Sequence, residues 1–111
     1  MLFCLCLFLV SCADNCKNIN GKFSSFSTSL RYDYLFTYDF NDGEVRLLNT
    51  SRTGIGADYK SGNTQTGTYE VKGEEVVMNF GGSDVILVIN RDANGCISSL
   101  SNEDSIYERQ K

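Results

Sequence analysis

The chain has no histidine, no proline and no tryptophan in its 111 residues. Without histidine it lacks the base of a Ser-His-Asp or Cys-His nucleophile system and an imidazole ligand for a metal ion. The commonest hydrolase and zinc chemistries are thereby excluded, so we expect a protein that is not an enzyme and that holds no catalytic residues, metal or cofactor.

Positive charge is also scarce, because 10 Lys and Arg stand against 14 Asp and Glu. This balance provides no basic surface for a nucleic acid or an anionic membrane. The length allows one domain. A chain of this size buries only about 60–65% of the surface that its unfolded form exposes, so a covalent cross-link would add much to its stability.

The first ten residues, MLFCLCLFLV, form an uncharged apolar run. The run is too short to cross a bilayer, which requires about 20 helical residues, but it has the length of the apolar part of a secretory signal. We therefore expect a signal peptide at 1–11, a tether or lead at 12–22, and a folded domain at 23–111.

The end of this run, Leu9-Val10-Ser11-Cys12, resembles the lipobox of bacterial lipoproteins. In that motif a branched apolar residue and two small or apolar residues precede the cysteine whose thiol accepts diacylglycerol. The resemblance implies that Cys12 is the lipid attachment site and that the protein is anchored to the bacterial cell envelope. The alternative is an ordinary signal cleaved after Ala13, which would give a secreted or periplasmic soluble protein.

Two cysteines, Cys16 and Cys96, remain in the mature chain under either cleavage. In an oxidising compartment we expect them to form a disulfide, although two free thiols are the alternative. A bridge that closes a loop of about 80 residues contributes on the order of 4 kcal/mol in the loop-entropy model.

Residues 30–40 alternate between apolar and mostly polar side chains, which predicts a half-buried strand. We expect the apolar set to fill the core rather than to line a ligand cavity, with Phe36 at its centre and Thr37 on the opposite face. The apolar set is Leu30, Tyr32, Tyr34, Phe36, Tyr38 and Phe40.

Turn sequences recur along the rest of the chain at a spacing of about ten residues, which is typical of an antiparallel meander. We predict an all-β fold of about seven strands that forms a closed or partly open lipocalin-like barrel. The apolar run 85–89 predicts a strand that is buried on both faces or covered by a loop. Residues 49–66, rich in Ser, Thr, Gly and Asn, are predicted to be the longest loop and the binding surface.

From Tyr34 onward the order of features resembles the small lipocalin-like domains of bacterial envelope lipoproteins. An aromatic strand runs into the Asp42-Gly43 turn, a Gly67-x-Tyr69 strand follows, and a short strand containing Tyr107 closes the chain. The resemblance implies a lipid-anchored or secreted meander barrel without enzymatic activity, and it indicates no site residues. We expect this protein to bind an unidentified small ligand or an envelope or host protein.

A second, shorter pattern consists of Gly56-Ala57-Asp58-Tyr59 and the later Lys72-Gly73. It is similar to the Gly-Ala-x-Tyr and Lys-Gly elements of the membrane-bound inhibitors of c-type lysozyme. The similarity implies an alternative function as a lysozyme inhibitor. A phage-encoded or envelope-stress interaction protein is a further alternative. Ile55 and Glu70 stand where those inhibitors have a serine and an aromatic residue. The candidate binding residues are Ile55, Gly56, Ala57, Asp58, Tyr59 and Lys72.

Overall fold

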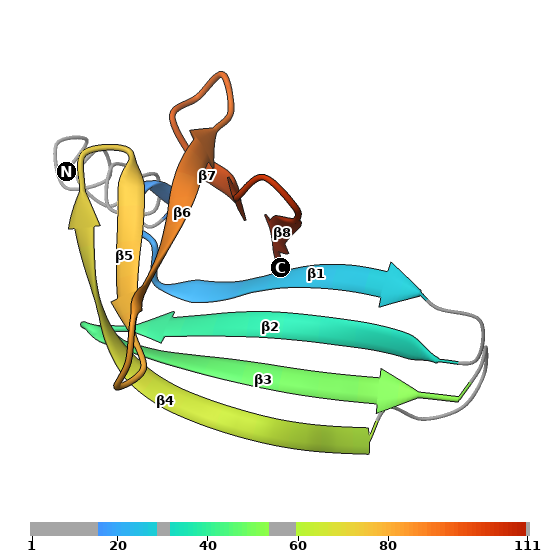
Figure 1. The fold of residues 1–111 in the computed structure, drawn as a ribbon. Helices are drawn as coiled ribbons and strands as arrows, with labels where there is room; N and C mark the ends of the chain where they lie inside the picture. Colours follow the sequence, from blue (N-terminus) through green and yellow to red (C-terminus); the bar gives the residue numbers. More distant parts are fainter. Residues whose placement is uncertain (1–15, 29–31, 54–59, 111) are drawn as a thin grey trace, which may run out of the picture.

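The computed structural model describes residues 16–28, 32–53 and 60–110. Eight antiparallel strands in these residues close into a barrel in chain order (Figure 1). The prediction of an all-β barrel is therefore confirmed. The strands are β1 (Gly21–Thr28), β2 (Asp33–Asn41), β3 (Glu44–Arg52), β4 (Lys60–Lys72), β5 (Glu75–Asn79), β6 (Asp84–Arg91), β7 (Ile97–Ser101) and β8 (Ile106–Arg109).

The predicted turns after β2 and β4 are confirmed. Asp42 and Gly43 join β2 to β3 with φ angles of 49° and 88°. Positive φ at both central residues is the conformation of the two-residue turns whose twist suits a hairpin. Gly73, with φ of 61°, lies in the turn between β4 and β5.

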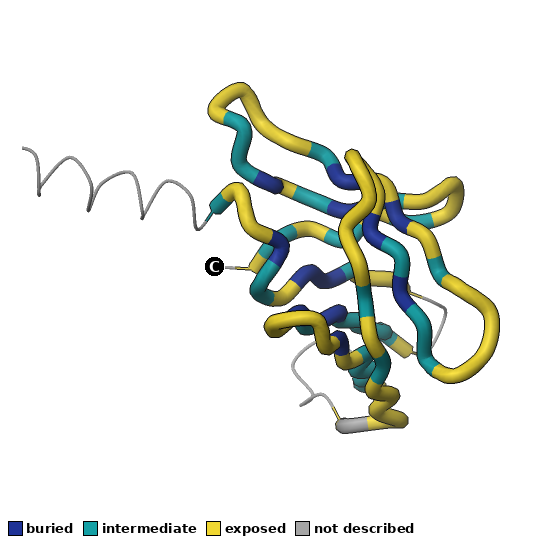
Figure 2. The backbone as a smooth tube through the Cα atoms, turned by 90° about the vertical axis from the view of Figure 1, so that its left-hand side faces the viewer, coloured by how far each residue is buried: buried dark blue, intermediate teal, exposed yellow. Residues whose placement is uncertain are grey.

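The hydrophobic core lies at the end of the barrel where all eight strands meet. Beyond that end, β1–β4 continue as a curved sheet (Figure 1). There β4 pairs only with β3 over Lys60–Gly67, and β1 pairs only with β2 over Ser25–Thr28. Figure 2 shows the buried residues gathered where the strands converge, with exposed hairpin tips. The core consists of Ile19, Phe23, Tyr38, Phe40, Val45, Val76, Met78, Leu87, Ile89, Ile97 and Leu100.

The central core position predicted for Phe36 is wrong. Phe36 is only partly buried, on the part of β2 that runs beyond the core, whereas Phe23 and Phe40 are fully buried. The predicted faces are nevertheless correct. Thr37 lies on the opposite face from Phe36, where its Oγ1 is 2.8 Å from the Oγ of Ser24. The alternation of residues therefore defines the inward face but not the extent of the core along the strand.

Much of the loop predicted at 49–66 is strand, because β3 continues to Arg52 and β4 begins at Lys60. Ladder hydrogen bonds join backbone groups, so a run of polar side chains can still form a strand. At the far end of this hairpin pair, Arg52 Nε lies 2.9 Å from Asp33 Oδ2. The prediction of a loop from the scarcity of apolar residues was therefore wrong for both ends of the segment.

The strand that the sequence did not predict is β1. Its sequence GKFSSFST has two large apolar residues, Phe23 and Phe26, three positions apart. That spacing places them on opposite faces of a strand, so no period of two is visible. Phe23 is in the core and Phe26 is exposed.

Strand β6 is buried on one face only, which corrects the expectation for residues 85–89. Leu87 and Ile89 are in the core, whereas Ile86 and Val88 lie on the other face and are about half exposed. An antiparallel sheet commonly has one face on the core and one in solvent. Because residues 85–89 are all apolar, the sequence has no alternation there that would distinguish the buried face from the exposed face.

Gly67 lies where β4 passes from the uncovered sheet into the barrel, since β4 pairs with β5 only from Thr68 onward. A Cβ atom at this position would collide with the carbonyl oxygen of Asn79 and approach the ring of Phe80 to 2.9 Å. The close approach of the β5 backbone thus requires glycine here.

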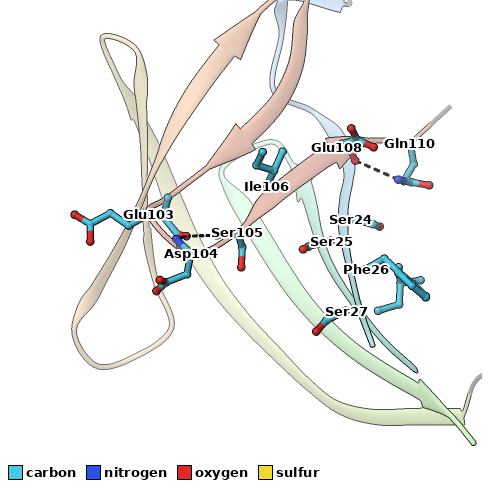
Figure 3. Close-up of a pocket in the computed structure, with 12 residues that line it drawn as sticks. Ser24, Ser25, Phe26, Ser27, Glu103, Asp104, Ser105, Ile106, Glu108 and Gln110 are labelled. Atoms are coloured by element: carbon cyan, nitrogen blue, oxygen red, sulfur yellow. Dashed lines mark hydrogen bonds between the residues drawn. The ribbon is translucent and has the colours of Figure 1, made fainter. Parts of the chain in front are cut away.

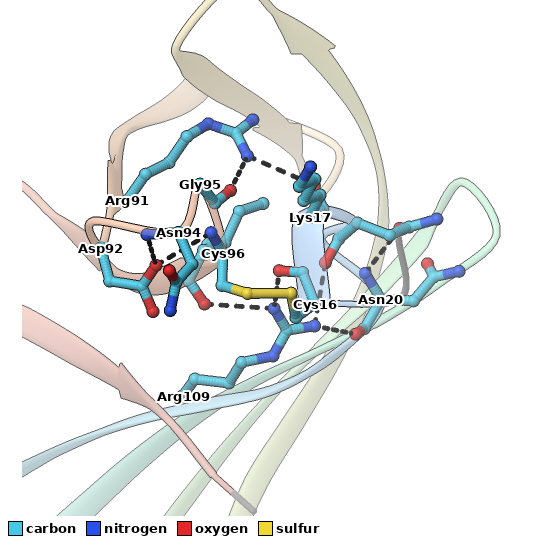
Figure 4. Close-up of a disulfide and its surroundings, with 11 residues drawn as sticks. Cys16, Lys17, Asn20, Arg91, Asp92, Asn94, Gly95, Cys96 and Arg109 are labelled. Atoms are coloured by element: carbon cyan, nitrogen blue, oxygen red, sulfur yellow. Dashed lines mark hydrogen bonds between the residues drawn. A yellow bond between two sulfur atoms is a disulfide. The ribbon is translucent and has the colours of Figure 1, made fainter. Parts of the chain in front are cut away.

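The segment before β1 is fastened to the barrel by a disulfide and by Arg109 (Figure 4). The predicted bridge between Cys16 and Cys96 is present. The Arg109 guanidinium lies 5.1 Å from the centre of the Phe23 ring, a cation–π distance. It also donates to the backbone carbonyl groups of Cys16 (2.9 Å), Asn18 (2.8 Å), Asn20 (2.7 Å) and Ile97 (3.1 Å).

Candidate functional site

The seam between β1 and β8 is the least complete part of the barrel. Phe23 pairs with Arg109 and Ser24 pairs with Glu108. Past these two positions, no described strand pairs with β1 on that side, although β1 pairs with β2 along its whole length. An edge with unpaired backbone groups can accept another strand.

The seam ends because β8 diverges from β1 beside a tight turn. In the register of the paired residues, Phe26 would face Ile106, but these two residues are not paired. The turn before Ile106 is fixed by Asn102, whose Oδ1 accepts the N–H groups of Asp104 (2.9 Å) and Ser105 (2.8 Å). Such side-chain to backbone bonds stabilise turns. The start of β8 adjoins this turn and pairs with β7 through Ile106 and Ser101, but it does not pair with β1.

A groove of about 720 Å³ occupies the gap (Figure 3). The hydroxyl groups of Ser25 and Ser27 point towards the turn between β7 and β8, and the Phe26 ring points the other way. The groove is lined by Ser24, Ser25, Phe26, Ser27, Leu35, Asn102, Glu103, Asp104, Ser105, Ile106, Glu108 and Gln110.

The groove combines exposed apolar side chains with negative charge. Phe26 is 55% exposed and Ile106 is 61% exposed, so each rim of the gap carries a large apolar side chain. Glu103, Asp104 and Glu108 contribute carboxylates, and no described lining residue is Lys or Arg. The site is therefore suited to a ligand with both apolar and cationic groups.

A ladder of aromatic rings continues the inner face beside the groove. Ser25 is opposite Phe36 and Ser27 is opposite Tyr34 in the β1–β2 register. The rings of Tyr34 and Phe36 are stacked with centroids 6.4 Å apart, and Tyr32 lies 6.2 Å from Tyr34. These rings were expected in the core, but Tyr32 is exposed and Tyr34 is only partly buried. They form a wall that a ligand in the groove could reach.

The barrel interior beside β8 contains a pair of phenols. The rings of Tyr38 and Tyr107 lie 5.0 Å apart, edge to face. Burial, together with the charge of Tyr107 and a hydrogen bond to it, raises the pKa of Tyr38 to about 12. The neutral phenol is favoured in the folded state, so this contribution to stability is complete below pH 10 and is lost as the pH rises towards 12. Tyr38 therefore offers no base at neutral pH.

Of the other residues predicted for function, Lys72 alone lies within the described parts. It is exposed at the end of β4, with its Nζ 3.9 Å from Glu70 Oε2. Cys12, the predicted lipid site, lies outside the described residues, as do Ile55, Gly56, Ala57, Asp58 and Tyr59. The lysozyme-binding surface therefore stays a prediction.

The groove could not be predicted from the sequence. Its residues come from β1, which was not predicted, from Leu35 of β2, and from the Asn102 turn, β8 and Gln110, and they become neighbours because β1 and β8 meet at the seam. The Ser25 and Ser27 hydroxyls two positions apart were the only local signal. Such a pair is typical of any polar strand face.

No cluster of three or more His, Cys, Asp or Glu in ranges 16–28, 32–53 and 60–110 could hold a metal ion. No helix in the same ranges is long and apolar enough to span a bilayer.

Comparison of the chain with family models, with curated proteins and with solved structures gave no match.

Proposed function

We propose that this protein is an exported, non-enzymatic binding protein of the bacterial cell envelope, and that its ligand occupies the groove between β1 and the β7–β8 turn. The observation that carries this proposal is the incomplete seam, where β1 separates from β8 after Ser24. Phe26 and Ile106, which the register of the seam would place opposite each other, are instead unpaired and line a groove.

The size and lining of the groove support a binding role. Its volume of about 720 Å³ falls in the range of about 300–1,000 Å³ that is common for ligand sites. The serine hydroxyls and the carboxylates supply polar groups that orient a ligand, while Phe26 and Ile106 supply apolar area. The exposed Tyr32 and its neighbours extend the surface along β2.

Site-specific photocrosslinking tests the location of the binding site. A photoreactive phenylalanine derivative at Ile106, on the groove, is expected to form adducts in an envelope extract of the source cells. The matched position is Val71, an exposed aliphatic residue of β4 outside the groove. Adducts from Ile106 that excess unmodified full chain suppresses, with none from Val71, support the proposal; adducts from neither position, or equally from both, contradict it.

The position at Val71 also tests the lysozyme alternative, because it adjoins Lys72. With purified c-type lysozyme added, crosslinking from Val71 alone would contradict the groove as the binding site and favour the inhibitor function. Inhibition of lysozyme activity by the full chain would be its independent measure.

The proposed export and anchoring depend on Cys12. Replacing Cys12 with alanine is expected to move the full chain from the membrane fraction to the soluble fraction, because the thioether-linked lipid is the proposed anchor. Mass spectrometry of the mature N-terminus measures the modification directly. An unmodified mature chain that begins at Asp14 would show cleavage after Ala13 and no lipid anchor.

A further inference from the structure

We infer that the groove binds an extended basic peptide, which joins the sheet as an added strand along β1. The inference rests on the proposed function and specifies the class of ligand. It follows from the direction of the backbone groups of β1, the side chains on either side of its free edge, and the charge of the groove.

The backbone of β1 presents unpaired groups to the groove. The N–H of Gln110 donates to the carbonyl oxygen of Lys22 at 2.8 Å, so the backbone groups of Lys22 point towards β8. In an antiparallel ladder, every second residue points to the same side. Ser24 uses this side to pair with Glu108. The N–H and C=O groups of Phe26, the next such residue, therefore face the groove, and no described strand pairs with them.

The side chains beside this edge suit a strand rather than a compact ligand. A strand added along β1 would place alternate residues against opposite faces of the sheet. On one face lie Ser25, Ser27 and the ring of Phe36, and on the other lie Phe26 and its cross-strand partner Leu35. The free edge from Ser25 to Thr28 is about 10 Å long at about 3.3 Å per residue.

The charge of the groove favours basic residues in the peptide. Glu103 and Asp104 are exposed on the turn, and Glu108 is exposed on β8. A cationic side chain on an added strand would approach these carboxylates without meeting a described Lys or Arg of the lining. Because the carboxylates are exposed, the attraction should weaken as salt is raised.

The sheet has a second free edge on β4, which provides an internal comparison. The N–H of Tyr69 donates to Gly43 towards β3 at 3.0 Å. By the same alternation, the backbone groups of Thr66 point away from β3, to a side on which no described strand pairs with it. This edge lacks the acidic groove that flanks β1. We therefore assign the peptide to β1.

The probe for this inference is a fluorescent octapeptide of alternating lysine and valine, titrated with the full chain at low salt and followed by fluorescence anisotropy. We expect saturable binding that weakens with salt. An octapeptide with glutamate in place of lysine should bind at least about tenfold more weakly. Equal binding of the two peptides, or no binding of the lysine peptide, would overturn the inference.

The decisive variants remove one backbone donor at each edge. Phe26→Pro deletes the N–H that faces the groove, and Phe26→Ala controls for loss of the ring. We expect Phe26→Pro to bind about tenfold more weakly than Phe26→Ala, the effect of about one backbone hydrogen bond. Thr66→Pro, the matched change on β4, should bind like the unmodified chain. Proline is tolerated on sheet edges, and circular dichroism verifies that each variant is folded.

Two results would overturn the assignment to β1. One is equal binding by Phe26→Pro and Phe26→Ala, and the other is loss of binding in Thr66→Pro alone, which would place the peptide on β4. If Ile106 crosslinks a ligand but the lysine peptide does not bind, the peptide class is wrong and the groove remains the binding site. If both experiments fail, the proposed function is wrong as well.

Discussion

Replacing Phe40 with alanine is expected to lower the free energy of unfolding by about 3–5 kcal/mol. Phe40 is 1% exposed. Its ring meets Phe23 and Tyr69 edge to face, with centroids 5.8 Å and 5.0 Å away. Truncation removes these contacts and leaves a cavity in a thin core. Because total stabilities are commonly about 5–15 kcal/mol, the variant should be largely unfolded or melt at a much lower temperature, as circular dichroism with urea or heat would measure.

The control is Phe36→Ala, a change on the same face of the same strand. Phe36 lies beyond the core and is only partly buried. Its truncation should cost about 1–2 kcal/mol, because less apolar area is lost and solvent can fill the space. A loss at Phe36 equal to the loss at Phe40 would contradict a core confined to one end of the barrel.

Phe36 and Phe40 show which features of the fold the apolar alternation of β2 could predict. Alternation along 30–40 placed Phe36 and Phe40 correctly on one face, and Thr37 on the other. Burial also depends on which strands lie across the barrel. Strand β5 has five residues and β8 has four, against nine in β2. Those lengths depend on turns elsewhere, so the pattern of β2 could not predict where its core ends.

The candidate site was harder to predict than the fold because it arises from pairing that is missing. Ser24 and Glu108 are 84 residues apart in sequence and are the last pair of the seam. Nothing in either segment indicates that the next two pairs of this register, Ser25 with Tyr107 and Phe26 with Ile106, fail to form. Strand propensity describes a segment by itself, whereas an open edge is a property of two segments and the turn that separates them.

The disulfide could be predicted from the sequence, because the mature chain keeps two cysteines and an exported protein reaches an oxidising compartment. Arg109 holds the same segment as the disulfide, but this role could not be predicted. A single arginine in a polar terminal strand usually lies in solvent. In the fold, Arg109 holds the carbonyl groups of residues before β1 and contacts the ring of Phe23. Burial lowers the pKa of its guanidinium.

Replacing both Cys16 and Cys96 with serine is expected to lower the free energy of unfolding by on the order of 4 kcal/mol. The bridge closes a loop with a sequence separation of 80 residues. Its loss therefore frees much conformational entropy in the unfolded chain. Urea unfolding of the double-serine variant measures the effect. Reduction of the unmodified chain should give a similar shift, and an unmoved midpoint in both experiments would contradict it.

The bridge and Arg109 should also depend on each other, because both hold the segment that precedes β1. Arg109→Ala alone should cost about 2–3 kcal/mol, since several carbonyl groups lose a charged donor. Without the bridge, that segment can detach before the barrel unfolds, and the bonds from Arg109 to Cys16 and Asn18 then contribute less. The loss in the triple variant should therefore be smaller than the sum of the separate losses, as a double-mutant cycle measures. Strict additivity would mean that the segment stays docked without its disulfide, so that Arg109 and the burial of Ile19 would suffice to hold it.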